Sequence, residues 1–483
     1  MTLSAIGTIR RPHPARSPVP VKPILEHPMR MSHYVLPAGM LLSACGSDPT
    51  PTAPAAASTG RSIRVEATQH RLANGLRVIL SEDHAAPTVS LCVTYNAGSR
   101  DEPPGRTGFA HLFEHMMFQG SARVGKGEHF ILVQANGGNM NGTTNADRTN
   151  YFQTLPSNQL ELGLFLEADR MSALAVNAAN FENQRNAVRE ERRLNYDNRP
   201  YGRTYEVLLE TAYDNFAYKH STIGAMADLD AAPLEAVQAF YETYYAPNNA
   251  VLALVGDFEP DVALKRIRSY FEPIPARPAP PEPDMTEPVQ RAERRATLED
   301  DFAQAPRIDI AWKIPPGNTP DWFALGVLGD ILADGESSRL YQTLVKRAQV
   351  AVEVYGGAQE RRGPSLLTLT ILTRPGQDLD AVERELDAVV ATLQQKPVET
   401  WELDKVRLQT RRQLAQQLQS TLTRAVLLAQ YAVFYGDPLY INSIEPKTAA
   451  VTSGDILRVC RRYLTPDNRT IVRTIPSSRK QKP

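Results

Sequence analysis

The sequence predicts an α+β protein of two homologous domains, each a largely antiparallel sheet with helices packed on one face. One observation is a duplication: strand-like runs begin after Pro87 and Pro306, and further strand-like runs follow Pro247 and Pro466. The two prolines of each pair are 219 residues apart. Two matches at the same offset indicate that a single fold occurs twice. A second observation is that hairpin-linked strands alternate with segments of helical spacing, which is typical of an α+β domain.

Local patterns assign the elements of the first half. Asn74-Gly75 lies between two alternating runs, 64–71 and 76–80, and predicts a β-hairpin. The Gly/Asn-rich segment 135–142 predicts a loop or turn. The other segments show either helical spacing or alternation, so we expect helices over 105–118, 160–174 and 180–196 and a strand over 148–155.

The composition is that of an ordinary globular protein with room for two or more domains. Of 483 residues, 42% are hydrophobic and 22% are charged. The formal net charge of −1 shows no basic excess that would indicate a nucleic-acid partner. Three cysteines are too few for a disulfide scaffold or an all-cysteine zinc site. No run of eighteen apolar residues occurs, so a membrane would be contacted only through a lipid anchor.

The N-terminal region has the pattern of an export signal. A basic start at Arg30, the mostly apolar run 34–44 and small residues before Cys45 make up this pattern. The four residues that end at Cys45 resemble a bacterial lipobox, which implies cleavage before Cys45 and a lipid on its thiol. The alternative is a buried core segment, but Pro37 and the Ser/Thr/Pro/Ala-rich tether 46–61 oppose it.

The residue after the cysteine indicates a location. In Gram-negative lipoproteins an Asp at this place is the usual inner-membrane retention signal, and here it is Gly46. The resemblance therefore implies an outer-membrane lipoprotein that faces the periplasm. Translation that starts at Met29 or Met31 would leave residues 1–28 outside the protein.

The remaining chain divides by composition and by the duplication. A Pro/Ala/Glu-rich stretch separates the two halves and suits an extended linker. We expect a signal region at 1–45, a tether at 46–61, a zinc-bearing domain at 62–272, a linker at 273–295, a metal-free homologous domain at 296–477 and a tail at 478–483.

The chemistry is concentrated in His111-Leu112-Phe113-Glu114-His115. In a helix, His111 and His115 lie one turn apart on one face, where two imidazoles can bind one zinc ion. Glu114 lies near this face and can hold a water without binding the metal. The order is the reverse of the HExxH motif. The alternative is a surface helix with unrelated polar groups, but its apolar neighbours indicate a helix beside the core, where such groups need partners.

A catalytic zinc usually has three protein ligands and one open position. The predicted helix 180–196 offers three candidates for the third ligand, namely Glu182, Glu190 and Glu191. Spacing alone does not choose among them, because such carboxylates are most often part of a solvated helix face.

The motif and its surroundings resemble the insulinase/pitrilysin family of zinc metallopeptidases, whose HxxEH members are called inverzincins. Further matches to this family lie at 96–102, 118–120, 137–144, 149–152, 185–191, 220–224 and 337–341. The resemblance covers roughly residues 62–477. It is closest to the half-length branch, which includes mitochondrial processing peptidase subunits and bacterial two-domain peptidases.

The resemblance implies roles for individual residues. His111, His115 and Glu191 would bind Zn²⁺, and Glu114 would take a proton from the attacking water and pass it to the leaving amine. An edge strand with Asn139, Asn141 and Thr143 would bind an extended peptide by backbone hydrogen bonds. For these last three residues, ordinary turn chemistry is the alternative.

The chain departs from the family pattern in two places. Many relatives have a second glutamate seven positions before the third ligand, where this chain has Gln184. Many relatives also have an Arg and a Tyr that contact the substrate, at positions that correspond here to Val345 and Val352. Arg347 and Tyr355 lie nearby but out of register. The loss of the pair implies that a partner chain supplies it.

Two classes of function remain open at this level. The resemblance implies a zinc-dependent endopeptidase for peptides or unfolded polypeptides, the catalytic subunit of a two-chain clamshell. Its partner would be a sister subunit that lacks HxxEH but carries the Arg/Tyr pair, with a homodimer as second choice. The alternative is a non-catalytic assembly or structural subunit on the same fold, and a purely structural zinc site is a weaker third interpretation. The four residues His111, Glu114, His115 and Glu191 favour the enzyme.

Overall fold

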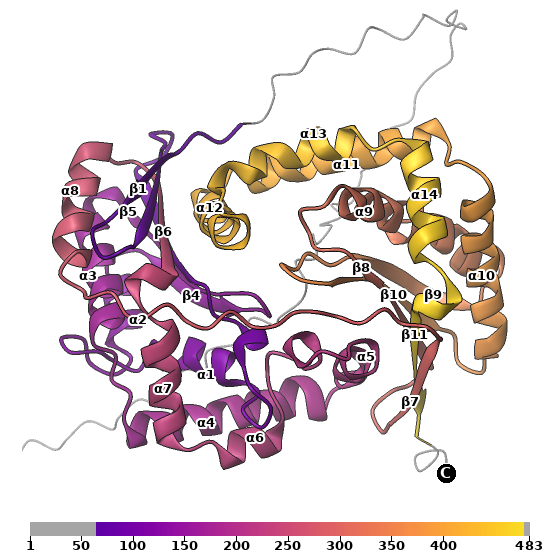
Figure 1. The fold of residues 1–483 in the computed structure, drawn as a ribbon, viewed down its shortest axis with the longest axis horizontal. Helices are drawn as coiled ribbons and strands as arrows, with labels where there is room; N and C mark the ends of the chain where they lie inside the picture. Colours follow the sequence, from indigo (N-terminus) through magenta and orange to yellow (C-terminus); the bar gives the residue numbers. More distant parts are fainter. Residues whose placement is uncertain (1–63, 478–483) are drawn as a thin grey trace, which may run out of the picture. The chain divides into compact units, whose positions relative to one another are not determined.

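A computed structural model describes residues 64–477. The predicted signal region, Cys45, the tether and the C-terminal tail lie outside the described residues. The described part contains two β-sheets and the helices that cover them (Figure 1). Within it, no helix is both long and apolar enough to cross a membrane.

The first sheet has six strands in the order β1-β2-β6-β3-β5-β4. Only β2 and β6 are parallel, and every other neighbouring pair is antiparallel. The predicted hairpin is confirmed, with Gly75 at a positive φ of 89° in its turn. The strands are β1 (Thr68–Arg71), β2 (Arg77–Glu82), β3 (Thr88–Tyr95), β4 (Asn139–Thr144), β5 (Thr149–Pro156) and β6 (Ala250–Gly256).

The second sheet repeats five strands of the first. Its order, β7-β11-β8-β10-β9, corresponds strand for strand to β2-β6-β3-β5-β4, and again only the first pair is parallel. β3 and β8 start 219 residues apart, and so do β6 and β11, which confirms the predicted duplication. The strands are β7 (Arg294–Asp300), β8 (Arg307–Ile314), β9 (Ala351–Ala358), β10 (Ser365–Thr373) and β11 (Arg469–Pro476).

The predicted helices of the first half are present as α1, α3 and α4; each ends earlier than predicted, and α4 starts two residues earlier, at Ala178. This half contains α1 (Phe109–Met116), α2 (Glu128–Ala135), α3 (Leu160–Ser172), α4 (Ala178–Arg192), α5 (Thr204–Ala212), α6 (Met226–Ala231), α7 (Leu234–Tyr244) and α8 (Pro260–Phe271). The second half contains α9 (Pro320–Ala333), α10 (Leu379–Gln395), α11 (Thr400–Gln417), α12 (Thr421–Tyr435), α13 (Ile444–Ala449) and α14 (Ser453–Tyr463). Several starts have side-chain caps, such as Asn177 before α4, whose side chain accepts a hydrogen bond from the Asn180 backbone N–H.

The prediction of a loop over 135–142 is wrong in its second part. A turn with Gly137 at a φ of 77° follows α2, but β4 already begins at Asn139. Glycine and asparagine have low strand propensity, and pairing with β5 along the whole of β4 overrides it.

The central strands of each sheet are buried on both faces, and each half places one helix against the sheet of the other half. Alternate strand residues pack against helices of the same half, as predicted, and the other residues pack against a helix of the other half. Cys92 of β3 and Ala253 of β6 lie in one core with Leu428 of α12, while Leu209 of α5 packs with Ala311 of β8. Figure 1 shows α12 beside β6 and α5 beside the second sheet.

No helix or strand lies between the end of α8 at Phe271 and the start of β7 at Arg294. The predicted linker 273–295 therefore ends slightly too late, because β7 begins inside it. The Arg277 N–H donates to Asn248 Oδ1 (3.0 Å), and the Gln290 amide donates to the Arg469 carbonyl (2.8 Å). The linker is thus held near both ends.

Candidate metal centre

A buried carboxylate fixes the start of α1. Gly108 has a φ of 91°, and a side chain there would meet the Ile223 carbonyl. The Glu102 carboxylate accepts hydrogen bonds from the N–H groups of Gly108 and Ala110, both at 2.8 Å, which have no partner within the helix. His220 Nε2 lies 3.1 Å from the same carboxylate. Glu102 and His220 belong to two of the other family-like segments, 96–102 and 220–224. These contacts give both segments a structural role at the start of α1.

The helix α1 presents its two histidines to α4. His111 Nε2 lies 3.8 Å from Glu191 Oε2, and His115 Nε2 lies 3.2 Å from the same oxygen. One potential ligand atom of each residue lies within 4.8 Å of the others. Tetrahedral zinc with bonds of about 2.0–2.1 Å separates its ligand atoms by about 3.4 Å. The separations and the two-imidazole, one-carboxylate donor set both fit a zinc ion with an open fourth position.

The structure brings only one of the three candidate glutamates to the histidines. Glu190 faces solvent and pairs with Arg193 at 3.2 Å, and Glu182 is exposed and pairs with Arg185. Glu191 lies on the side of α4 that contacts α1. The described residues contain no other group of three His, Cys, Asp or Glu side chains arranged like this one.

Glu191 and His115 stabilise each other's charged forms. Burial alone would raise the pKa of Glu191, but its hydrogen bond with His115 and the charge of His111 lower it. Burial alone would lower the pKa of His115, and the hydrogen bond with Glu191 raises it. Gln184 also bonds to His115, and the Asn195 side chain bonds to Glu191. Asn195 was not among the predicted site residues, although it lies four residues after Glu191, about one helical turn along.

Glu114 belongs to a separate contact with β4. The Thr144 hydroxyl donates to Glu114 Oε2 at 2.7 Å. A side chain at Gly142 would come within 2.8 Å of Glu114 Cγ, so glycine lets the strand and the carboxylate approach closely. Neither Gly142 nor Thr144 was among the predicted site residues. The Glu114 carboxylate is therefore held by a neutral donor and is not part of the three-residue cluster.

The predicted substrate residues lie on an edge strand, because β4 ends the sheet. Asn139 and Asn141 are at least partly exposed, and Asn141 Oδ1 accepts from the Gly142 N–H. The Thr143 hydroxyl donates to Asn150 Oδ1 at 2.5 Å and accepts from Arg148. Alternation along β4 puts Thr143 on the face opposite Thr144, away from Glu114.

Val345 and Val352, which occupy the positions expected for Arg and Tyr, have different surroundings. Val345 packs against a hydrophobic core, whereas Val352 on β9 is exposed. The Arg347 guanidinium donates to the Thr343 hydroxyl at 2.7 Å, and Tyr355 lies on β9. The expected register in the second half thus holds two valines in place of an Arg and a Tyr.

Two family descriptions match consecutive parts of the chain, which together make up more than half of it. Insulinase (Peptidase family M16) matches residues 77–226, which include α1, β4 and α4. The description "Peptidase M16 inactive domain" matches residues 231–410. The chain belongs to the insulinase family.

Relatives within this family are similar over most of their length. Zinc protease PqqE from Helicobacter pylori is 28% identical over 404 residues, which are 83% of this chain and 91% of the relative. The crystal structure of a protease from Helicobacter pylori has a TM-score of 0.82 at 28% identity and covers 85% of this chain and 100% of that chain.

A more distant structure shares the fold. The first half of the periplasmic protease PqqL from Escherichia coli has a TM-score of 0.69 at 18% identity, covering 86% of this chain and 93% of that chain. Against full-length PqqL the match covers 48% of that chain with a TM-score of 0.70. The insulinase-family chain described here is thus similar in fold to half of a longer protein.

Proposed function

We propose that this member of the insulinase family is a zinc-dependent endopeptidase. The observation that carries the proposal is the convergence of His111, His115 and Glu191, with Glu114 held apart from them by Thr144. A site that only bound a metal for structure would not need a further carboxylate beside its ligands. The name of the Helicobacter relative, a zinc protease, supports the same class of activity.

Different residues of the chain would bind the metal, transfer the proton and bind the substrate. His111, His115 and Glu191 would hold zinc, which when bound polarises a peptide carbonyl and acidifies water. Glu114 would accept a proton from the attacking water and return it to the amine that leaves. The Thr144 hydroxyl orients the carboxylate by donating to Oε2, which leaves Oε1 for the water. The free edge of β4 would pair with an extended peptide through Asn139, Asn141 and Thr143.

The decisive experiment separates metal binding from proton transfer. Glu114→Gln removes the proton acceptor and none of the three clustered groups, so zinc should stay while peptide hydrolysis falls by about 10²-fold or more. Removal of zinc with a chelator should abolish hydrolysis by the wild-type protein, and added zinc should restore it. Glu190→Gln is the matched control and should keep both zinc and activity. Wild-type hydrolysis by Glu114→Gln would refute the proposal.

The alternative is a non-catalytic subunit on the same fold. The family description for residues 231–410 is that of an inactive domain, and it concerns the half without the cluster. This alternative predicts zinc-independent assembly and no chelator-sensitive hydrolysis. The same assay therefore distinguishes the two functions.

We further propose that the active form contains two chains. The fold corresponds to half of full-length PqqL, and this chain has Val345 and Val352 where the family resemblance implies an Arg and a Tyr. A sister chain with that pair would donate hydrogen bonds to the substrate carbonyl, and loss of such a donor typically reduces the rate about 10²–10³-fold. Mixing the two chains should raise hydrolysis strongly. A fully active homodimer that is unaffected by Arg347→Ala and Tyr355→Phe would contradict this.

The N-terminal sequence supports export and a lipid anchor at Cys45, with the protein at the outer membrane facing the periplasm. Lipid on the mature chain can be detected by mass spectrometry. Cys45→Ser should move the protein from the membrane fraction to the soluble fraction. An unchanged membrane fraction would count against the anchor.

A further inference from the structure

The helix α11 presents two large apolar side chains to solvent. Trp401 is 55% exposed and Leu408 is 68% exposed, and within residues 64–477 no other helix has two large apolar side chains exposed to this degree. Seven residues separate them, which places both on one face of the helix, two turns apart. The opposite face packs into the second half through Leu403 and Val406, which are buried. The described part of the chain thus leaves the face with Trp401 and Leu408 uncovered.

Basic side chains lie on the same face of α11. Lys405 follows Trp401 by four residues, and Arg412 follows Leu408 by four residues, which is about one helical turn in each case. Lys405 donates to two neutral groups, the Asp334 carbonyl at 3.4 Å and the Ser337 hydroxyl at 3.3 Å. Apolar and basic side chains therefore alternate along one exposed face of one helix.

The two acidic side chains of α11 already have basic partners. Glu402 is buried and accepts a hydrogen bond from Arg339 at 2.7 Å, and Asp404 pairs with Arg407 at 3.1 Å. The Arg412 guanidinium is exposed, and within the described residues it has no hydrogen bond and no ion pair. Its charge is therefore available to an anionic group outside the described chain.

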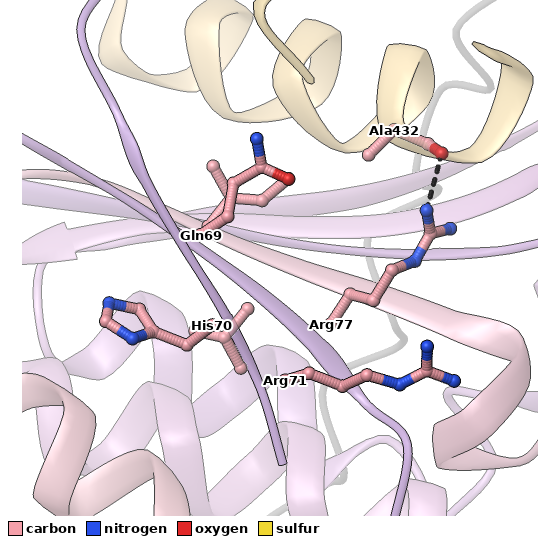
Figure 2. Close-up of a pocket in the computed structure, with 7 residues that line it drawn as sticks. Gln69, His70, Arg71, Arg77 and Ala432 are labelled. Carbon is pink, nitrogen blue, oxygen red and sulfur yellow. Dashed lines mark hydrogen bonds between the residues drawn. The ribbon is translucent and has the colours of Figure 1, made fainter. Parts of the chain in front are cut away.

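The described chain begins beside the helix that neighbours α11. The Val65 N–H donates to Asn442 Oδ1, and the Asn442 amide donates to the Val65 carbonyl, both at 2.8 Å. Asn442 lies two residues before α13, and α13 packs against α11. A second contact holds the β1–β2 hairpin to the same half, because the Arg77 guanidinium donates to the Ala432 carbonyl of α12 at 2.7 Å (Figure 2). The chain that follows Cys45 thus enters the described structure next to α13.

The length of chain before this point limits its distance from a lipid on Cys45. Eighteen residues, 46–63, lie between Cys45 and the first described residue. They span at most about 65 Å when fully extended, and shorter spans are favoured because more chain conformations allow them. The proposed anchor therefore holds the side with α13 and α11 toward the bilayer. Figure 1 shows these two helices at the top and α1 and α4 at the bottom, so the candidate metal centre lies on the other side.

We propose that the exposed face of α11 binds the surface of a phospholipid bilayer with anionic headgroups. This face consists of Trp401, Lys405, Leu408 and Arg412. Trp and Leu side chains accompanied by Lys and Arg are typical of helices that lie in a membrane interface. The contact would fix the orientation of an anchored chain, with the candidate metal centre away from the lipid. The bilayer as occupant rests on the proposed anchor at Cys45, whereas the face itself rests on the exposure and charge of α11.

Quenching of tryptophan fluorescence by brominated lipids tests this contact. The chain has three tryptophans, of which Trp312 is buried and Trp322 is partly buried and donates to the Gln359 carbonyl at 2.8 Å. The full chain is reconstituted on vesicles of phosphatidylethanolamine and phosphatidylglycerol, with or without bromine on the acyl chains. Emission should be lower with the brominated lipid. Trp401→Phe keeps an aromatic ring but removes the reporter, so it should abolish this loss, whereas the matched control Trp322→Phe should retain it.

Lipid composition and further variants test the charge and the apolar contact. Replacement of phosphatidylglycerol by the zwitterionic phosphatidylcholine should weaken the quenching. Arg412→Gln should lower the docking equilibrium constant, determined from the extent of quenching, about fivefold. Leu408→Ser should lower it about tenfold. Both side chains are exposed, so the fold should be unaffected. Arg266→Gln, at an exposed arginine on α8, is the matched control and should behave as the wild type.

Absence of bromine-dependent quenching, or quenching that persists in Trp401→Phe, would overturn the proposal. A protein partner is the competing occupant of this face. In that case Leu408→Ser would lower the mass of a complex in sedimentation velocity, with no quenching by brominated lipid, and the proposal would be wrong.

Failure of the lipid anchor gives a different result. A chain without lipid on Cys45, as determined by mass spectrometry, that still shows Trp401-dependent quenching when vesicles are added supports the α11 face without the anchor. A lipidated chain without such quenching has the anchor and not the face, which would contradict the proposal.

Discussion

Glu190 and Glu191 are neighbours on α4, yet their carboxylates have different surroundings. Glu190 is exposed beside Arg193, whereas Glu191 lies between His111 and His115. Glu191→Gln replaces an anionic oxygen with a neutral one and should weaken zinc binding. The loss should exceed the roughly 10–100-fold that removal of an outer-shell partner produces. Titration with a chromogenic zinc chelator measures the affinity.

Glu190→Gln is the matched control, because it makes the same chemical change one residue away. It should leave zinc affinity within about twofold of the wild type, as expected for an exposed ion pair. If Glu190→Gln released zinc and Glu191→Gln did not, the residue in the cluster would be wrongly assigned. Asn195→Ala should have a smaller effect than Glu191→Gln, because Asn195 only bonds to the Glu191 carboxylate.

The parts of the site that are local in sequence are the parts that sequence can predict. His111 and His115 are one helical turn apart, so their shared face follows from the helix period. The choice of Glu191 depends on how α4 packs against α1, and spacing alone left Glu182 and Glu190 open. Thr144 was missed because its contact with Glu114 joins a strand to a helix 30 residues earlier.

At the scale of elements, β4 shows where local composition misleads. Its sequence is rich in glycine and asparagine, which predicts a turn, but β5 supplies hydrogen-bonding partners along its whole length. The glycine also has a packing reason. Only a residue without Cβ lets the strand pass within contact of Glu114, so Gly142 reflects the neighbouring helix and not a bend in the chain.

Gly142→Ala should therefore disturb the carboxylate. The added Cβ would lie 2.8 Å from Glu114 Cγ, so strand or side chain must shift. Overpacking of this kind typically costs about 1–3 kcal/mol of stability. A displacement near 1 Å at a reacting group lowers rates by up to about 10²-fold. We expect hydrolysis to fall at least tenfold with zinc retained, measured by peptide turnover and metal analysis.

Gly326→Ala is the control for this prediction. Gly326 lies in α9, and a Cβ there meets no atom within 4 Å. The substitution should raise the free energy of unfolding by up to about 1 kcal/mol, because alanine favours the helix, and should leave turnover unchanged. Equal turnover in Gly142→Ala and Gly326→Ala would show that β4 does not position Glu114.

At the scale of the whole molecule, the two halves stabilise each other through exchanged helices. The duplication was visible in the sequence because two separate pairs of strand starts are both 219 residues apart. The exchange of α5 and α12 was not predicted, since nothing local states which helix covers the second face of a sheet. One signal was present in the sequence: residues 250–255 of β6 are all apolar, which is the pattern of a strand covered on both faces.

The second half contains a partly buried acid that contacts α12, the helix that covers the first sheet. Glu360 lies in the loop between β9 and β10 and accepts a hydrogen bond from the hydroxyl of Tyr435 of α12 at 2.8 Å. Burial raises the pKa of Glu360 to about 7 from an ordinary value of 4.5. The folded protein therefore keeps a proton on Glu360 in a pH range where the unfolded chain has lost it.

This difference has a definite sign. Between about pH 4.5 and pH 7 the folded state binds more protons than the unfolded state, so the free energy of unfolding falls as the pH rises. Glu360→Gln keeps an acceptor for Tyr435 and removes the titration. From pH 5 to pH 8 the wild type should lose on the order of 3 kcal/mol relative to the variant, at about 1.36 kcal/mol per unit of pKa shift. Urea unfolding of both proteins at several pH values measures the difference, and the other titrating groups cancel because both proteins contain them. Parallel pH dependence of the two proteins would show that Glu360 titrates in the folded protein at the same pH as in the unfolded chain.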